Sequence, residues 1–138
     1  MKILIDTNII IDYLKGREPF AEYAEKIIEL CNQGELQGFL TASAVTDIYY
    51  ILKKTAKHRQ IIDGLKMLFS ILEIAPVDKI DLLRAMNADM PDLEDALVSQ
   101  CAKKVKADFI VTRNAKDFAD SVVQPITPRK LLAQIKAD

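Results

Sequence analysis

Short apolar runs alternate with longer amphipathic stretches along this chain. Runs of strand length are bounded by polar or turn-forming residues and lie at 2–5, 38–41, 72–77 and 108–112. The pair Val122–Val123 suggests a further short edge strand. Between these runs, apolar residues recur every three or four positions, which predicts amphipathic helices. Helices are expected at 8–14, 20–33, 43–54, 61–69, 79–88, 91–104, 115–119 and from 127 onward.

Helix-ending and helix-starting residues fall where this pattern needs them. Gly16 and Gly34 follow two predicted helices, as expected for residues that end a helix. Ser43 is a plausible N-cap for the helix after the second strand. Pro128 follows Thr127 and suits the first turn of the last helix.

Strands that alternate with helices predict a parallel sheet covered on both faces. The 138 residues fit a single domain spanning 1–138, and half of them are hydrophobic, enough for one full core. In such α/β sheets, sites form beyond the carboxyl ends of the strands. Residues that directly follow a strand are therefore the first candidates for chemistry.

Composition narrows the class of protein. No run reaches the ~18 apolar residues of a membrane span, and the apolar start is too short for a signal peptide, so a cytoplasmic protein is expected. One histidine and two distant cysteines, Cys31 and Cys101, argue against a zinc site, and both cysteines fall on apolar helix stripes as reduced core residues. A net charge of −1 argues against a general DNA-coating protein.

Two acids follow the first two predicted strands. Asp6 ends the apolar run of residues 2–5, where a carboxylate loses free energy unless it is paired or bound to metal. The same residue could simply cap the following helix. Asp47 lies one turn into the helix after the second strand and faces either solvent or the strand ends.

A third acidic group opens the helix predicted at 91–104. Asp92, Glu94 and Asp95 lie in its first turn, where the helix dipole favours negative charge. That general preference is a sufficient explanation for Asp92 and Glu94. It explains Asp95 less well, because Asp95 directly precedes the apolar run Ala96–Val98 and shares a helical face with Asp92.

Polar residues also follow the fourth strand. Thr112 and Asn114 could cap the short helix at 115–119. Asp117 comes three residues after Asn114, which resembles a capping box and gives Asp117 a structural role. Taken together, acids or polar groups follow several strands of one sheet, and their mutual repulsion calls for a cation. Oxygen ligands without histidine or cysteine point to Mg²⁺ or Mn²⁺.

The combined motifs resemble the PIN-domain nucleases, and within them the VapC-like toxins of type II toxin–antitoxin systems. The resemblance covers nearly the whole chain and rests on segments in the family's order and spacing: residues 5–8, the Asp47 helix, 92–97 and 110–118. It implies a three-layer α/β/α sandwich with a central parallel sheet of four or five strands. It also implies an Mg²⁺- or Mn²⁺-dependent endoribonuclease, a protein antitoxin and a homodimer.

The resemblance assigns roles to individual residues. Asp6 and Asp95 match the family acids that contact metal, and Asp47 stands where glutamate is more frequent. Asn114 stands at the fourth acidic position, so Asp92 is predicted to act as the auxiliary acid. The predicted catalytic set is Asp6, Asp47, Asp92 and Asp95.

Substrate and partner contacts are predicted from nearby residues. RNA is expected to meet residues beside the strand ends and the basic run after the Asp47 helix: Thr7, Asn8, Thr112, Asn114, Lys53, Lys54 and Lys57. A solvated helix end is the plainer explanation for the three lysines, because cations suit helix C-termini. Residues 49–52 are too apolar for one buried stripe, which suggests contact with another chain.

Two other functions fit parts of this pattern. The short Asp47 and the neutral Asn114 leave room for a catalytically weakened PIN-fold module that binds RNA or protein. A phosphatase of the haloacid-dehalogenase type also uses an aspartate after the first strand. Those phosphatases typically carry a second aspartate two residues later, where this chain has Asn8.

Overall fold

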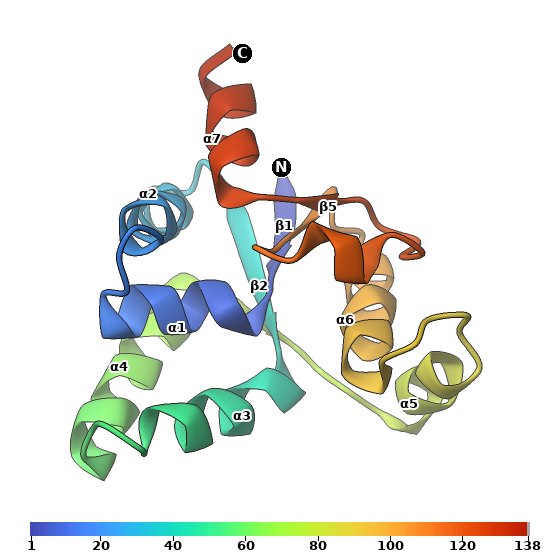
Figure 1. Cartoon of the computed structure of the whole chain (residues 1–138), viewed down its shortest axis with the longest axis horizontal. Coiled ribbons are helices and arrows are strands. Elements are labelled where there is room, and N and C mark those ends of the chain that lie inside the picture. Colours follow the sequence, from blue (N-terminus) through green and yellow to red (C-terminus); the bar gives the residue numbers. More distant parts are fainter. Residues whose placement is uncertain (138) are drawn as a thin grey trace.

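A computed structural model describes residues 1–137. Its five strands form one parallel sheet in the order β3-β2-β1-β4-β5 (Figure 1). The strands are β1 (Lys2–Ile5), β2 (Gln37–Thr41), β3 (Glu73–Ala75), β4 (Phe109–Val111) and β5 (Pro125–Ile126). The predicted three-layer α/β/α architecture with a parallel sheet is confirmed.

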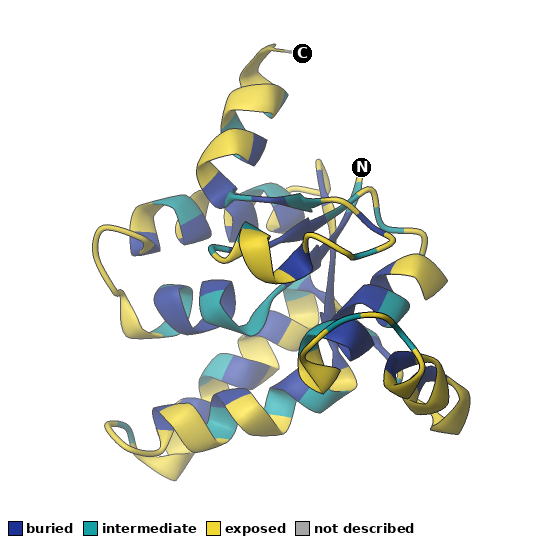
Figure 2. Ribbon diagram, turned by 45° about the vertical axis from the view of Figure 1, so that its right-hand side comes forward, coloured by how far each residue is buried: buried dark blue, intermediate teal, exposed yellow. Residues whose placement is uncertain are grey.

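Helices cover both faces of the sheet. On one face lie α1 (Thr7–Lys15), α2 (Ala21–Asn32), α3 (Ala42–Leu52), α4 (His58–Ile71) and α7 (Pro128–Ala137). On the other lie α5 (Lys79–Met86), α6 (Leu93–Lys104) and the short 3₁₀ helix η1 (Ala115–Phe118). Buried residues line the inner sides of both layers (Figure 2). Within residues 1–137, no helix is long and apolar enough to cross a membrane.

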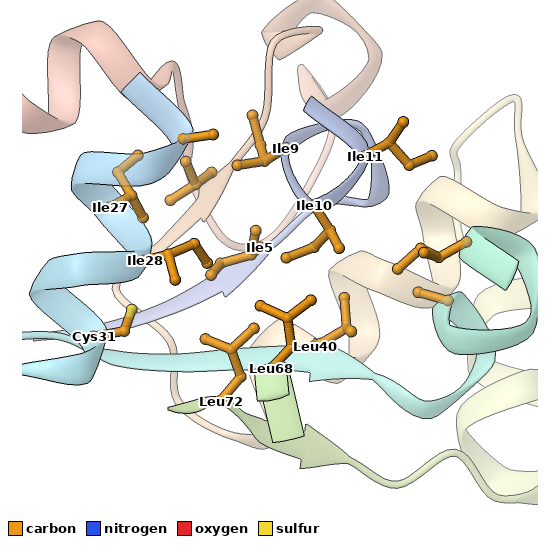
Figure 3. Close-up of a cluster of buried hydrophobic side chains, with 14 of the residues drawn as sticks. Ile5, Ile9, Ile10, Ile11, Ile27, Ile28, Cys31, Leu40, Leu68 and Leu72 are labelled. Carbon is orange, nitrogen blue, oxygen red and sulfur yellow. The ribbon is translucent and has the colours of Figure 1, made fainter. Parts of the chain in front are cut away.

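Successive side chains of the strands enter different cores, as their alternation requires. Ile5 and Leu40 pack with α1, α2 and α4, and Figure 3 shows them between Ile10, Ile28 and Leu68. Leu4 and Ile110 face the smaller core under α5 and α6. The buried strands therefore hold both helix layers in fixed positions relative to the strand ends.

Close packing explains the glycine within β2. A Cβ atom on Gly38 would lie 2.8 Å from the Cys31 sulfur and 2.7 Å from a methyl group of Leu72. Cys31 and Cys101 are free and buried, as predicted, and burial raises the pKa of the Cys31 thiol to about 12. The thiols therefore act as apolar core groups.

Two local predictions are wrong. The edge strand is Pro125–Ile126 and not Val122–Val123, because hydroxyls of Ser99 and Ser121 accept the N–H groups of Val122 and Val123. The helix after β2 begins at Ala42, so Ser43 is not its N-cap. The chain passes from strand to helix directly at Thr41, which is already extended and buried.

Candidate active site

Asp6 stands at the carboxyl end of the central strand and also caps α1. Its Oδ1 accepts the N–H of Thr7 at 2.8 Å. Its Oδ2 accepts the hydroxyl of Thr112 at 2.8 Å and the amide of Asn8 at 3.3 Å. The capping role and the site role considered for Asp6 are thus compatible, since the cap bond fixes the direction of the carboxylate. Asn8, Thr7 and Thr112 lie beside Asp6, where the sequence placed them.

The environment of Asp6 disfavours its negative charge. Burial raises the pKa of Asp6 most strongly, and the nearby carboxylate of Asp117 raises it further. The hydrogen bonds from Thr112 and Thr7 and the charge of Arg113 oppose this rise without cancelling it. A nearby cation would stabilise the ionised form.

The start of α6 brings further acids to the same place. Asp92 is the N-cap of α6, and its Oδ1 accepts the N–H of Asp95 at 2.9 Å. Asp95 is half-buried, and its pKa is raised to about 6 by burial and by the charges of Asp92, Asp6 and Asp117. Asp95 and Asp6 therefore lie close enough for their charges to interact, as predicted from the sequence.

Glu94 was explained from the sequence by the helix dipole alone, yet it faces Asp47. Burial raises the pKa of Glu94, and so do the charge of Asp47 and a hydrogen bond between the two carboxyl groups. Asp47 itself is exposed on α3. Since α3 and α6 are far apart in sequence, no spacing in the chain signals this pair.

Asp117 does not have the local capping role that the sequence predicted for it. The predicted capping box is absent: Asn114 makes no side-chain cap bond, and its backbone at φ −113°, ψ 60° is not the extended form of a cap. The Asn114 N–H instead donates to the Thr112 hydroxyl at 3.0 Å. Asp117 is exposed on η1, and its charge acts on Asp6 and Asp95.

One of the three predicted lysines lies beside the acids. Lys54 lines a hollow of about 270 Å³ together with Thr7, Asp47, Glu94 and Tyr50. Lys53 lies over the Tyr49 ring, 6.0 Å from its centroid, and Lys57 is the N-cap of α4. Lys53 is the exposed C-cap of α3, so the plainer explanation of a solvated helix C-terminus applies to it. Lys57 is also exposed but stands at the N-terminus of α4, where the helix dipole does not favour a cation.

The acidic cluster consists of Asp6, Asp47, Glu94, Asp95 and Asp117, with Asp92 at its edge. Among residues 1–137, no three of its carboxylates converge closely enough to ligate one ion directly. The donor set still fits a hard divalent cation that keeps several water ligands, as Mg²⁺ does. Direct bonds from one or two carboxylates and water-mediated contacts from the others meet that requirement.

Comparison with known proteins gives a consistent result. A family model described as PIN domain matches residues 2–116. The curated protein "Ribonuclease VapC1" of Aquifex aeolicus (strain VF5) is 28% identical over 131 residues, covering 91% of this chain and 90% of that protein.

Solved structures also resemble most of this chain, and two of them are described here. A toxin–antitoxin complex from Klebsiella pneumoniae contains a chain with 25% identity and a TM-score of 0.68, covering 91% of this chain and 97% of that one. VapBC2 from Rickettsia felis, bound to a DNA fragment from its promoter, contains a chain with 18% identity and a TM-score of 0.72. The match covers 92% of this chain and 98% of that one. The second likeness concerns the fold alone.

Proposed function

This chain belongs to the PIN domain family, and on that premise we propose that it is a ribonuclease that hydrolyses RNA phosphodiester bonds with Mg²⁺ or Mn²⁺. Similarity to a protein named as a ribonuclease supports the reaction class. The observation that carries the proposal is the crowding of Asp6, Asp95 and Asp117 at the carboxyl end of the sheet. The charge of Asp117 raises the pKa values of Asp6 and Asp95, and a divalent cation offsets that repulsion.

The metal would be held by Asp6 and Asp95, with Asp117 and Asp47 contributing through water. When bound, such a cation lowers the pKa of a water molecule and neutralises charge on the phosphodiester. The protein's own groups orient the acids: Thr112 and Thr7 fix both oxygens of Asp6, and Asp92 fixes the turn that carries Asp95. These bonds preorganise the site before substrate arrives.

Substrate would lie over the polar residues around these acids. Lys54 opens onto the hollow beside Asp47 and supplies a positive charge for a phosphate. The backbone N–H of Asn114 donates to the Thr112 hydroxyl, which holds this residue beside the acids. Asn114 is exposed, so its side-chain amide can contact the RNA strand. In this proposal Asp6, Asp47 and Asp95 keep the roles predicted from the sequence, Asp92 positions Asp95, and Glu94 and Asp117 are added to the acids.

A catalytically weakened binding module is the second candidate, since Asp47 is short and Asn114 is neutral. Two contacts favour the enzyme. Glu94 reaches Asp47 from α6 and adds a longer carboxylate at that position. Asp117 supplies, beside Asp6, the charge that Asn114 lacks. The phosphatase alternative has no support from the family match.

A toxin–antitoxin role and self-association are proposed on separate grounds. The Klebsiella pneumoniae neighbour is a toxin–antitoxin complex, so a protein antitoxin is the expected partner. Of the apolar run on α3, Leu52 is buried, whereas Tyr50 is 64% and Ile51 is 37% exposed. These two residues leave an apolar face open for a second copy of the chain.

Cleavage of a labelled RNA by the purified protein tests the function. Activity should require Mg²⁺ or Mn²⁺, and Asp6→Asn or Asp95→Asn should abolish it while the circular dichroism spectrum stays that of a folded protein. Arg84→Gln, an exposed charge change on α5, serves as a control that keeps activity. Equal cleavage in excess EDTA would overturn the metal requirement.

A further inference from the structure

A fully buried carboxylate lies outside the acidic cluster. The side chain of Asp12, on α1, is 1% exposed, and two arginines bind it. Arg113 Nε donates to its Oδ2 at 2.7 Å, and Arg113 Nη2 donates to Oδ1 at 3.3 Å. Arg17 donates to Oδ1 through Nε at 2.9 Å and through Nη2 at 2.8 Å. One carboxylate therefore joins two arginines from opposite ends of the sequence.

The arrangement carries more positive charge than burial of Asp12 requires. A single bidentate guanidinium offsets one carboxylate, so the second arginine leaves a net charge of about +1. Each guanidinium has five N–H donors, and Asp12 occupies only the Nε and Nη2 sides of each. The remaining N–H groups of Arg17 and Arg113, whose side chains are 41% and 27% exposed, are available to another acceptor.

Arg113 lines a hollow of about 580 Å³, here called the arginine pocket, and Arg17 stands outside its lining. The residues of the pocket used below are Phe20, Tyr23, Arg113, Thr127, Pro128 and Arg129. The Arg113 guanidinium stacks 3.9 Å from the centroid of the Phe20 ring, and Phe20 is 39% exposed. The N-terminus of α7 begins at Pro128 on the pocket wall and adds its positive dipole end. The pocket thus combines cationic groups with two aromatic rings.

The arginine pocket and the acidic cluster share one segment of backbone. Arg113 stands between Thr112, which binds Asp6, and the exposed Asn114. The positive charge of Arg113 is close enough to lower the pKa of Asp6. On the other side, α1 leads from Asp6 to Asp12 with a rise of about 9 Å. Figure 1 shows α1, α2 and α7 on the same side of the sheet.

We propose that the arginine pocket binds a backbone phosphate of single-stranded RNA next to the phosphodiester held at the acidic cluster. This inference rests on the proposed ribonuclease function and names a subsite for its substrate. Guanidinium groups match the oxygens of a phosphate in pairs, and exposed aromatic rings beside them accept stacked bases. An acidic peptide could also pair with the arginines, but it has no bases to stack on the aromatic rings.

The test is RNA binding by protein that cannot cut. Fluorescence anisotropy of a labelled single-stranded RNA dodecamer is measured with the Asp6→Asn protein in Mg²⁺ over a series of salt concentrations. Adding Arg129→Gln should raise Kd several-fold and reduce the slope of log K against log salt by about 0.7, the value for one lost phosphate contact on a single strand. Arg84→Gln, on the opposite face of the sheet, should change neither quantity.

The outcomes separate this subsite from the proposed function. If the wild type cleaves RNA but Arg129→Gln keeps the original slope, the pocket assignment fails and the ribonuclease stands. If RNA binding depends on Arg129 but the wild-type protein does not cleave RNA, the pocket assignment stands and the ribonuclease proposal fails. If a glutamate-rich peptide shows the dependence on Arg129 and RNA does not, the pocket binds protein segments and the RNA assignment is overturned.

Discussion

The Thr112 hydroxyl donates to Asp6 Oδ2 at 2.8 Å and joins the ends of β4 and β1. The oxygen of the Thr112 hydroxyl also accepts the N–H of Asn114 at 3.0 Å. One buried hydroxyl therefore fixes both the central acid and the loop that carries Arg113 and Asn114. Its loss affects the site in two ways.

Thr112→Val removes both bonds while nearly keeping the side-chain shape. The variant should bind Mn²⁺ several-fold more weakly by calorimetry, because Asp6 loses a donor that orients its ionised form. Its free energy of unfolding should fall by about 1–2 kcal/mol, since Asp6 loses a donor and the partly buried N–H of Asn114 loses its acceptor. Thr112→Ser keeps the hydroxyl and should bind Mn²⁺ like the wild type. A valine variant with unchanged Mn²⁺ affinity would show that the bond does not orient the site.

Asp95→Asn should stabilise the metal-free protein near neutral pH. The pKa of Asp95 is about 6 in the fold, against an ordinary value of 3.8, so the folded state holds the proton more tightly. Wild-type stability therefore rises as pH falls from above 6 toward 4, and the ionised group is a cost at pH 7.5. The amide removes that cost, which is about 1–2 kcal/mol after allowance for partial exposure.

Urea unfolding of the Asp95→Asn protein in EDTA measures this gain. The advantage over the wild type should be present at pH 7.5 and should shrink by pH 4.5, where Asp95 is protonated. An equal difference at both pH values would mean that the effect comes from packing and not from charge.

Asp92 and Asp117 should respond oppositely to substitution. Asp92→Ala removes the N-cap of α6 and should lower the free energy of unfolding by about 1 kcal/mol. Asp117→Asn removes a charge that acts on Asp6 and Asp95, and should weaken Mn²⁺ binding with little change in stability. The sequence favoured Asp92 as the auxiliary acid. Asp92→Asn keeps a good N-cap and so tests the charge alone. If it binds Mn²⁺ weakly while Asp117→Asn binds Mn²⁺ normally, Asp92 is the auxiliary acid after all.

Lys104→Met should reverse the pH dependence that Asp81 contributes. Burial raises the pKa of Asp81, but the hydrogen bond from Lys104 and the N–H of Asp78 outweigh it, and the net pKa is lowered. The Lys104 Nζ lies 2.5 Å from Asp81 Oδ2 and 2.7 Å from the Pro76 carbonyl oxygen. The stabilisation is present at neutral pH and is lost as pH falls below the ordinary aspartate range.

Without Lys104, the buried Asp81 has no cation and its pKa should rise. The variant should lose about 2–3 kcal/mol at pH 7, less than for a fully buried pair because the lysine is 36% exposed. On mild acidification the variant should then gain more stability than the wild type does, because its Asp81 also takes up a proton. Thermal unfolding at pH 7 and pH 5 checks this, with the exposed Lys103→Met as the matched control.

Hydrophobic patterning by itself determined most of the architecture. Apolar runs of strand length and helical periodicities located β1, β2, β4 and most helices, because burial on a sheet or helix face demands those periods. It also placed Asp6, Asp47 and Asp95 near strand ends, since each follows a strand or opens a helix in the chain. Edge pieces such as β5 were misplaced, because short edge strands carry little apolar signal.

Tertiary packing decided which of these residues meet. Thr112 reaches Asp6 across 106 positions because β4 lies beside β1, and the strand order is not written in any local period. Glu94 meets Asp47 only because α6 and α3 both begin at the same edge of the sheet. Asp12 is bound by Arg17 and Arg113 only because α1 packs beside the loop after β4, which no local pattern around Asp12 indicates. Local sequence reports which face of an element is buried, whereas the pairing of charges depends on contacts between elements, and those form only in the folded chain.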